Sequence, residues 1–266
     1  MSSFRLIQPT APKVPILLSV PHCGTQFPPE LKNQFRQELA AAPDDTDWFV
    51  HKLYDFAASM GITMIHSVYS RWVIDLNRDP QSKPLYNDGR IITALCPATT
   101  FKGESLYVDN RTAVEQSEVE RRVEIYYKPY HEQIEKKLFE LKNLFGKVLL
   151  WECHSIRQFV PTVHPDKFPD LIIGDNDGKS ADKELSDIAL KQLKKTNLAV
   201  SHNAPFKGGH ITRHFGVPSK GFNAIQLEMT KVNYMDNSET SYDEARANKM
   251  RTLLKKVFSE LIAKLS

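Results

Sequence analysis

The sequence contains few cysteines, and none of them occurs in a redox or metal-binding spacing. Cys23, Cys96 and Cys153 cannot all pair and form no C-x-x-C motif. This argues against a disulfide framework and favours a reducing compartment. The first residues contain no signal-peptide core, and no stretch is long and apolar enough for a membrane-spanning helix. We therefore expect a soluble, cytoplasmic protein.

Two common catalytic motifs and a strong charge bias are also missing. The chain has no G-x-S-x-G motif and no glycine-rich phosphate loop, which weakens a serine-hydrolase or nucleotide-binding interpretation. The formal net charge is only +3, and the basic residues are spread along the chain. We therefore expect neither nucleic acid nor a membrane as a partner.

Length and patterning predict one α/β domain over residues 1–266. The chain is 41% hydrophobic, enough for a substantial core. Apolar runs expected to be strands alternate with stretches of helical spacing. The predicted strands cover 15–20, 62–68, 148–155, 171–174, 198–201 and 222–228, and the predicted helices 47–60, 112–145, 180–195 and 240–266. This order predicts a central, mostly parallel (mixed) sheet flanked by helices, with 203–216 as a polar loop.

Several predicted strands end in polar side chains. The apolar run 148–151 becomes polar at Glu152 and His154, which share one side of a strand, while Cys153 points to the other. The other polar strand ends are His22, the segment 71–78, Asp175 and Glu228. Parallel strands end at one edge of a sheet, where α/β proteins commonly bind ligands. We therefore expect these groups to converge.

The residue types at these strand ends suit a hydrolytic metal site. His22, His154 and one acidic residue would supply three ligands of a zinc ion and leave a fourth position for water. Zinc lowers the pKa of such a water, and Glu228 would accept its proton. A structural role for Glu228 is harder to argue, because an unpaired buried carboxylate is costly. Arg71 would stabilise an oxyanion, and Arg78 would bind a substrate carboxylate.

Structural explanations remain open for most of these residues when the pattern is taken alone. A single histidine at a strand end is more often part of a hydrogen-bonded framework than a ligand. Asp45 and Asp47 precede a predicted helix, where capping would explain them. Arg71, Asp75 and Arg78 would also form an ordinary surface salt-bridge patch.

Seven short motifs occur in order along the chain. They are S-V-P-H-C-G at 19–24, D-T-D-W at 45–48, S-R-W-V-I-D-L-N-R at 70–78, W-E-C-H-S at 151–155, P-D-L-I-I-G-D at 169–175, F-K-G-G-H-I-T-R-H-F-G at 206–216, and Q-L-E with Y-M-D within 226–236. In this set, which spans nearly the whole chain, the sequence resembles the N-formylglutamate amidohydrolase (N-formylglutamate deformylase) family. The resemblance implies a zinc-exopeptidase-like, phosphorylase/hydrolase-like fold.

The resemblance also implies a ligand set and a catalytic group. It implies Zn²⁺, or another divalent first-row metal, on His22, His154 and an acid of the D-T-D motif. Asp47 is favoured over Asp45, because it keeps the register of a D-x-x-V pattern in the wider family. Glu228 is implied as general base and acid.

Substrate-binding residues follow from the same resemblance. The D-L-N-R motif is similar to a substrate-carboxylate motif and implies Asn77 and Arg78. Arg71 takes the position of an oxyanion-stabilising arginine, and Gly209 and Arg213 are candidates from the 206–216 motif. The family commonly has aspartate at position 152 and tyrosine at position 210, where this chain has glutamate and histidine.

The implied reaction is hydrolysis of N-formyl-L-glutamate to formate and L-glutamate, as in histidine degradation. One alternative is a zinc deacylase for another N-acyl amino acid or small peptide. Another is a metal-free binding protein for acidic metabolites. The segment 85–103 follows the D-L-N-R motif, a position that would suit a lid.

Overall fold

Seven strands form a single sheet in the computed structural model, which describes residues 2–81 and 94–266. They are β1 (Phe4–Ile7), β2 (Ile16–Val20), β3 (Thr63–Ser67), β4 (Val148–Ile156), β5 (Leu171–Gly174), β6 (Val200–His202) and β7 (Phe222–Thr230). Their order in the sheet is β1-β3-β2-β4-β7-β5-β6. The four central strands, β3, β2, β4 and β7, are parallel, whereas β1 pairs antiparallel with β3 and β5 antiparallel with β7. The predicted mixed, mostly parallel sheet is confirmed.

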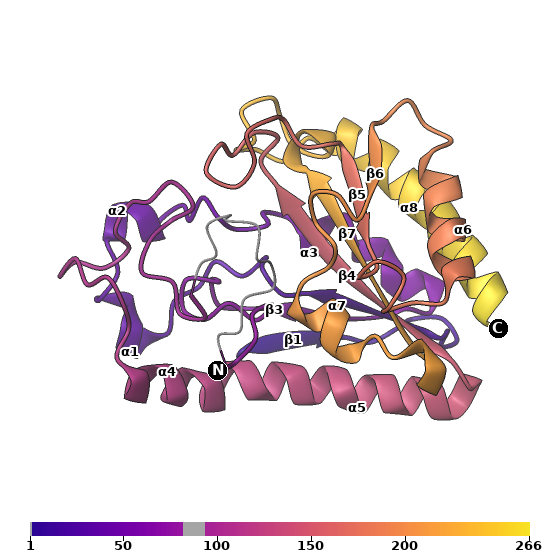
Figure 1. Cartoon of the computed structure of the whole chain (residues 1–266), viewed down its shortest axis with the longest axis horizontal. Coiled ribbons are helices and arrows are strands. Elements are labelled where there is room, and N and C mark those ends of the chain that lie inside the picture. Colours follow the sequence, from indigo (N-terminus) through magenta and orange to yellow (C-terminus); the bar gives the residue numbers. More distant parts are fainter. Residues whose placement is uncertain (1, 82–93) are drawn as a thin grey trace.

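Helices cover both faces of the sheet (Figure 1). The longer α-helices are α4 (Gln116–Arg122), α5 (Lys128–Phe145), α6 (Lys183–Leu193) and α8 (Glu244–Leu265). The short α-helices are α1 (Pro29–Lys32), α2 (Gln37–Ala40), α3 (Val50–Leu53) and α7 (His210–Phe215). The elements η1 (Asp55–Met60), η3 (Pro218–Lys220) and η4 (Lys231–Asn233) are 3₁₀-helices, and η2 (Val123–Tyr127) is a π-helix. No helix in the described ranges is long and apolar enough to cross a membrane.

The alternation of side chains along β4 shows how the two faces differ. Leu149, Trp151 and Cys153 pack into the cluster that α3, α6 and α8 cover. Leu150 points the other way, into the cluster that α5 and α7 cover. Glu152 and His154 follow Leu150 on the same face of β4. They therefore lie beside α7 at the carboxyl edge of the sheet. The cysteine faces the opposite core, as predicted.

Several local predictions differ from the structure. The polar segment 203–216, predicted to be a loop, contains helix α7, in which Ile211 and Thr212 are completely buried. The helix predicted over 180–195 begins only at Lys183, and the Ser180 hydroxyl donates to the carbonyl of Ala224 at 2.8 Å instead. The predicted helix over 47–60 is shorter and irregular, with Phe49 in the left-handed region at its start. Of the segment 85–103, for which a lid is expected, residues 85–93 lie outside the described residues.

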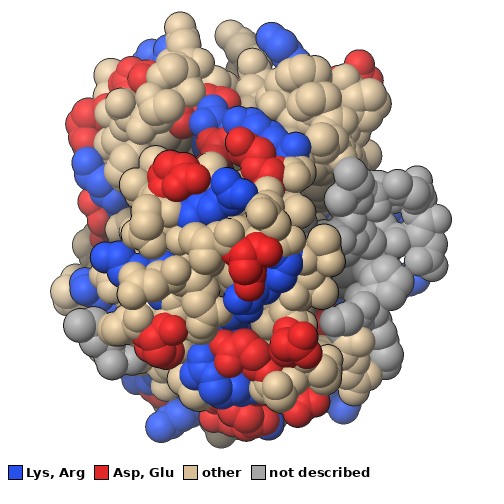
Figure 2. Space-filling view, turned by 90° about the vertical axis from the view of Figure 1, so that its left-hand side faces the viewer, with Lys and Arg blue, Asp and Glu red and all other residues tan. Residues whose placement is uncertain are grey.

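The surface shown in Figure 2 carries basic and acidic side chains interspersed over the same face. This mixture agrees with the small net charge of +3. Charge of both signs in close alternation favours solubility over attraction to a polyanion.

Candidate active site

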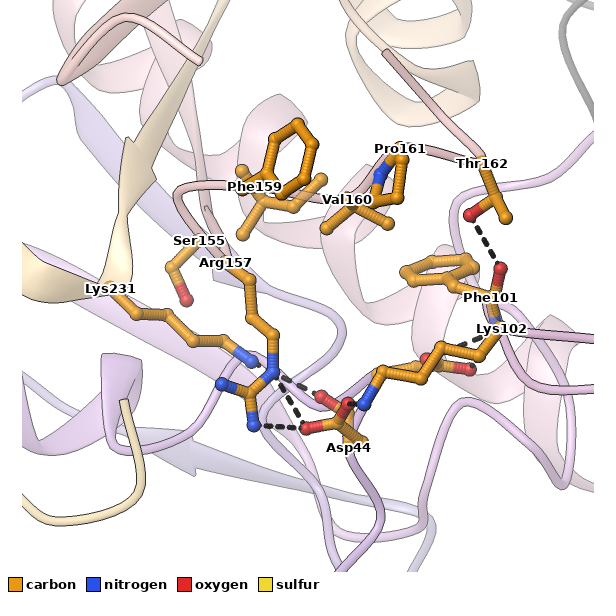
Figure 3. Close-up of a pocket in the computed structure, with 12 residues that line it drawn as sticks. Asp44, Phe101, Lys102, Ser155, Arg157, Phe159, Val160, Pro161, Thr162 and Lys231 are labelled. Carbon is orange, nitrogen blue, oxygen red and sulfur yellow. Dashed lines mark hydrogen bonds and ion pairs between the residues drawn. The ribbon is translucent and has the colours of Figure 1, made fainter. Parts of the chain in front are cut away.

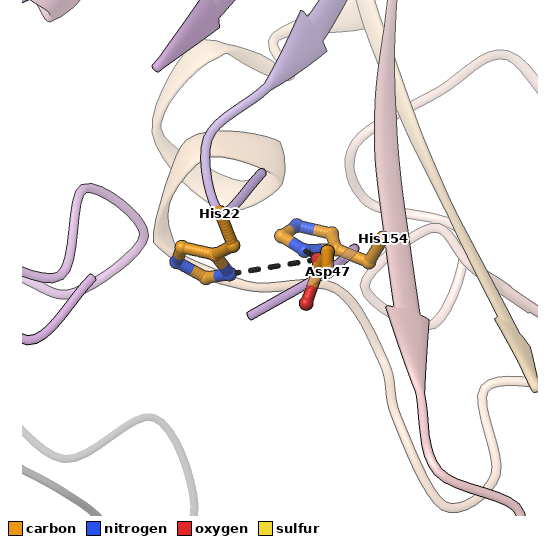
Figure 4. A group of neighbouring side chains, drawn as sticks. All are labelled: His22, Asp47 and His154. Atoms are coloured by element: carbon orange, nitrogen blue, oxygen red, sulfur yellow. Dashed lines mark hydrogen bonds and ion pairs between the residues drawn. The ribbon is translucent and has the colours of Figure 1, made fainter. Parts of the chain in front are cut away.

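Three predicted metal ligands meet at the carboxyl edge of the sheet. His22 follows β2, His154 lies near the end of β4, and Asp47 lies in the loop before α3. The two histidine rings converge on the Asp47 carboxylate (Figure 4). Asp47 Oδ2 lies 3.0 Å from His154 Nδ1 and 3.9 Å from His22 Nδ1. All three residues are buried, with 3% exposure each.

His22 is oriented by a buried carboxylate on its far side. Asp75 Oδ1 lies 2.7 Å from His22 Nε2, and Asp75 is completely buried. His22 Nδ1 has no hydrogen-bond partner although it is buried. Burial acts to raise the pKa of Asp75. Nearby positive charge, above all that of the Arg71 guanidinium, nevertheless holds this pKa well below its usual range. A charged Asp75 fixes the proton on Nε2 and leaves the Nδ1 lone pair facing Asp47.

His154 is held in the same way by Glu152. Glu152 Oε1 lies 2.6 Å from His154 Nε2, and Glu152 Oε2 accepts a hydrogen bond from the backbone N–H of Thr212 in α7. Burial acts against the charge of His154, but Glu152 and Asp47 raise its pKa well above the usual value. Between two carboxylates the ring therefore carries a second proton, on the nitrogen that faces Asp47.

The three side chains fit a divalent metal ion. Their candidate ligand atoms lie within 4.8 Å of one another, a spacing that one ion can bridge. Each histidine presents Nδ1 to the centre, and a carboxylate holds its Nε2, as is usual for metal-binding histidines. The unpartnered Nδ1 of His22 is the clearest sign, because a metal ion would satisfy it. Binding would displace the proton from His154 Nδ1.

Glu228 lies beside this cluster and has no polar partner. It is paired with His154 in the register of β4 and β7, so the two side chains share one face of the sheet. Its side chain is 8% exposed and forms no hydrogen bond or ion pair with any other residue in the described parts of the chain. Burial, with the nearby Asp47 charge, raises the pKa of Glu228 to about 8. Such a carboxyl is suited to proton transfer near neutral pH.

Arg71 lines the same site with a fixed positive charge. Its guanidinium donates to Asp75 Oδ2 at 2.6 Å and lies 4.8 Å from the centroid of the Phe101 ring. Burial opposes its charge, but Asp75, Asp47 and Asp45 raise its pKa. Arg71 is 9% exposed, so this charge is largely shielded from water. It therefore supplies a directed hydrogen-bond donor next to the metal-binding cluster.

Asn77 and Gly209 connect the site to α7. The Asn77 amide nitrogen lies 3.0 Å from His154 Nε2, and its Oδ1 accepts from the backbone N–H of Ile211 at 2.8 Å. A Cβ atom on Gly209 would lie 2.2 Å from the Asn77 amide nitrogen, so only glycine fits this approach. The Gly209 N–H donates to Gln226 Oε1 at 2.8 Å. The Asn77 side-chain oxygen and the Gly209 N–H thus both have protein partners at the site.

The two remaining arginines approach from neighbouring segments. Arg78 Nε lies 3.5 Å from Asp75 Oδ2, and the Arg78 side chain is 20% exposed. Arg213 comes from α7, and its Nε donates to the Gly208 carbonyl at 2.9 Å. Neither is buried as deeply as Arg71, so both keep contact with the solvent side of the site.

The structural alternatives are mostly excluded by the geometry. Asp45 does not cap a helix; its carboxylate accepts from Trp72 Nε1 at 2.8 Å and from the backbone N–H of Phe101. Asp75 is buried, so the 71–78 segment is not a surface salt-bridge patch. Asp175 does not join the site, because β5 is antiparallel to β7, and its carboxylate contacts His202 instead.

Two residues left open by the sequence have defined places. His210 stacks on His214, with ring centroids 5.2 Å apart, and is not part of the metal-binding cluster. Asp75 is the residue whose role the sequence analysis missed. Its only signal was the position between Arg71 and Arg78, which also suits a surface patch.

Comparison with known proteins identifies relatives over almost the whole chain. The sequence model of the family described as N-formylglutamate amidohydrolase matches residues 14–235. An N-formylglutamate deformylase of Pseudomonas putida is 38% identical over 254 residues, which cover 94% of this chain and 93% of the relative. One of Pseudomonas aeruginosa is also 38% identical over 254 residues, with 94% of each chain covered.

Solved structures share the fold. An N-formylglutamate amidohydrolase from Ralstonia eutropha JMP134 superposes with a TM-score of 0.83 at 24% identity over 99% of both chains. A protein from Agrobacterium tumefaciens superposes with a TM-score of 0.73 at 18% identity, covering 98% of this chain and 96% of that one. At these identities the two structures support the overall fold.

Proposed function

This chain belongs to the N-formylglutamate amidohydrolase family, and on that basis we propose that it hydrolyses N-formyl-L-glutamate to formate and L-glutamate. The observation that carries the proposal is the position of Glu228, a buried carboxylate without a polar partner, next to a three-residue metal-binding cluster. A purely structural carboxylate would have hydrogen-bond partners, because its burial without them is costly. We further place the reaction in the cytoplasm, in histidine degradation.

His22, Asp47 and His154 are proposed to hold a divalent metal ion, with Zn²⁺ favoured by the two nitrogen ligands and one oxygen ligand. When bound, such an ion polarises the amide carbonyl and lowers the pKa of water. Asp75 and Glu152 keep the two histidine rings turned toward it. The expected ligand geometry is therefore present before the metal binds, which reduces the reorganisation needed on binding.

Glu228 is proposed to move the proton in both halves of the reaction. As a carboxylate it accepts a proton from the attacking water, and as a carboxylic acid it gives this proton to the leaving amine nitrogen. The Arg71 guanidinium donates hydrogen bonds to the oxygen of the formyl group as negative charge develops there. Arg71 suits this task because Asp75 holds it in place from the opposite side.

The glutamate part of the substrate is proposed to bind on the Asn77 side of the site. Arg78 and Arg213 bind its carboxylates, which guanidinium groups match with paired hydrogen bonds. Asn77 and Gly209 hold α7 against the sheet, so that Arg213 stays near the site. Selectivity for an acidic amino acid follows from two arginines rather than one.

Formate release from N-formyl-L-glutamate tests the reaction directly. We expect metal-dependent release that stops after chelation and returns with Zn²⁺. Glu228→Gln keeps the shape of the side chain but cannot transfer the proton, so turnover should fall by roughly 10²- to 10⁴-fold while the metal content stays unchanged. Full activity of the Gln variant would remove Glu228 from the mechanism.

The choice of acidic ligand has its own test. Asp47→Asn should lose most of the affinity for Zn²⁺, because the amide oxygen is neutral and the remaining ligands are two imidazoles. Asp45→Asn is the matched control, since the Asp45 carboxylate contacts Trp72 and Phe101 instead. Titration with a chromogenic chelator compares the two affinities. Loss of affinity in the Asp45 variant alone would reverse the assignment.

A further inference from the structure

A cavity of about 350 Å³ adjoins the metal-binding cluster. Ser155 lines it, and the Ser155 N–H donates to Asp47 Oδ2 at 3.2 Å. Phe101 also lines it, under the guanidinium of Arg71. The cavity therefore shares two of its walls with the proposed active site. Its size suits a small organic group, whereas a formyl group has a single carbon atom and would leave this space unused.

The cavity has an apolar side and a charged side (Figure 3). Phe159, Val160 and Pro161 lie along one side, and Phe101 closes one end. The opposite side carries cationic and acidic groups, namely Lys102, Arg157, Lys231 and Asp44. A ligand that fits both sides has an apolar body and a polar end.

Two of the three cations are already neutralised. The Asp44 carboxylate accepts a hydrogen bond from Arg157 Nε at 2.8 Å and forms an ion pair with Lys102 Nζ, also at 2.8 Å. Arg157 also contacts Glu239, at 3.2 Å. These pairs leave little charge on Arg157 and Lys102 for a ligand.

Lys231 is different, because it has no acidic partner. Its side chain is 2% exposed, and its ammonium group donates to one backbone carbonyl, that of Asp44, at 3.2 Å. It forms no ion pair with any carboxylate in the described ranges, although an ammonium group has three donors. Burial lowers the pKa of Lys231 against the opposing effect of the nearby acidic residues, Asp47 foremost. A buried ammonium group with unused donors at the edge of a cavity is chemically suited to an anionic group.

The cavity lies on the acyl side of the proposed substrate. Asp47 lies on the Nδ1 side of His154 and also accepts from the Ser155 N–H, whereas Glu152 and Asn77 lie on the Nε2 side. The cavity thus begins on the Nδ1 side of this ring, and the proposed glutamate site on the Nε2 side. With the scissile amide between them at the metal-binding cluster, the acyl group points toward the cavity.

We propose that this cavity binds an acyl group that ends in a carboxylate, so that the protein also hydrolyses N-acyl-glutamates with a short dicarboxylic acyl group. This inference rests on the proposed function, because it uses the same hydrolytic site. Water adds its oxygen to the acyl carbon, the C–N bond breaks, and a proton goes to the amine nitrogen. The products are a free dicarboxylate and glutamate. Lys231 binds the distal carboxylate, and the apolar wall contacts the methylene chain.

The test compares three substrates with the zinc-loaded protein. They are N-formyl-L-glutamate, N-glutaryl-L-glutamate and N-pentanoyl-L-glutamate, the last two having equal chain lengths with and without the distal carboxylate. We expect kcat/KM for the glutaryl compound to exceed that for the pentanoyl compound by about 10-fold or more, as for a charge-assisted hydrogen bond. Lys231→Met should lower the ratio of glutaryl to formyl turnover by about 10- to 100-fold. Lys147→Met, the matched control at a lysine that pairs with Asp182 outside the cavity, should leave this ratio within about threefold.

Binding provides a readout that does not depend on turnover. Glutarate should bind the metal-free protein in calorimetry, and Lys231→Met should weaken this binding while Lys231→Arg and Lys147→Met keep it. Equal turnover of glutaryl and pentanoyl substrates, or equal losses on all substrates in Lys231→Met, would overturn the inference. Hydrolysis of the formyl compound alone would overturn it and leave the proposed function standing. Hydrolysis of the glutaryl compound alone would do the reverse, and no hydrolysis of either would overturn both.

Discussion

At the scale of single residues, carboxylates that do not face the metal-binding centre control the histidines that do. Asp75 and Glu152 each contact the Nε2 atom of one histidine, at 2.7 Å and 2.6 Å. Each fixes a tautomer and a ring orientation, so the two Nδ1 atoms face one point. The arrangement depends on the negative charge of these buried groups as much as on their shape.

Asp75→Asn should weaken binding of Zn²⁺ by about 10- to 100-fold, because the amide keeps the size of the side chain but removes its charge. Competition against a fluorescent chelator measures the change. Asp175→Asn is the matched control, since Asp175 is a buried carboxylate that contacts a histidine, His202, away from the site. Equal affinities in the Asp75 variant and the unaltered protein would show that Asp75 serves only the fold.

Sequence patterns identified the residues at strand ends but not Asp75. Glu152, His154 and Glu228 each follow an apolar strand, and such an abrupt change of polarity is visible along the chain. Asp75 lies in an irregular segment among arginines, where nothing in the local pattern distinguishes a buried charge network from an exposed one. The buried Asp75 carboxylate is paired with Arg71 and His22. These contacts form only when the chain folds.

At the scale of secondary structure, α7 is the element that closes the site. In this short helix, the backbone N–H of Thr212 donates to the Glu152 carboxylate, and the backbone N–H of Ile211 donates to the Asn77 side-chain oxygen. Two side chains of the site thus satisfy free N–H groups in its first turn, as helix caps do. The segment was predicted to be a loop because it is polar and six residues are too few to show helical periodicity.

Gly209→Ala should separate α7 from the 71–78 segment. The added Cβ would lie 2.2 Å from the Asn77 amide nitrogen, and relief of such overlap typically costs about 1–3 kcal/mol. Chemical unfolding measures the loss in the free energy of unfolding, and kcat/KM for the formyl substrate should fall as well. The double variant with Asn77→Ala has no clash. Its loss in the free energy of unfolding should therefore be smaller than the sum of the losses in the two single variants. Strict additivity would place the strain elsewhere.

At the scale of the whole molecule, the sheet was predictable in class but not in detail. Alternating strands and helices imply parallel pairing, and the four central strands follow this rule. The antiparallel direction of β5 was not predictable, because four apolar residues are equally compatible with either direction. For the same reason, the prediction that Asp175 would join the other polar strand ends was wrong. The polar residues at the ends of β2, β4 and β7 do lie together, as predicted.

Global stability should depend on pH through His131. Its ring stacks on Tyr127 with centroids 4.0 Å apart, and its Nε2 lies 2.8 Å from the Leu76 carbonyl oxygen. Burial lowers its pKa from 6.5 to about 3. Between these values the unfolded chain binds a proton and the folded chain does not, so stability is present above pH 6.5 and declines as the pH falls toward 3.

His131→Gln keeps a donor toward Leu76 but does not titrate. From pH 7.5 to pH 5, the free energy of unfolding of the unaltered protein should fall by about 1–2 kcal/mol more than that of the variant. Urea denaturation at both pH values, with metal removed, measures this difference. Parallel pH profiles for the two proteins would show that His131 is accessible to protons in the folded state.

The strand order also determines when the site comes into existence. Leu17 of β2 pairs with Leu150 of β4, and β4 in turn pairs with β7. On a ribosome that adds roughly 5–20 residues per second, His22 leaves the exit tunnel on the order of ten seconds before His154 does. During this interval the nascent chain has no complete coordination sphere, and parallel pairing of such high contact order is slow to form. The proposed metal ion can therefore bind to all three ligands only after His154 has been synthesised and β4 has paired with β2.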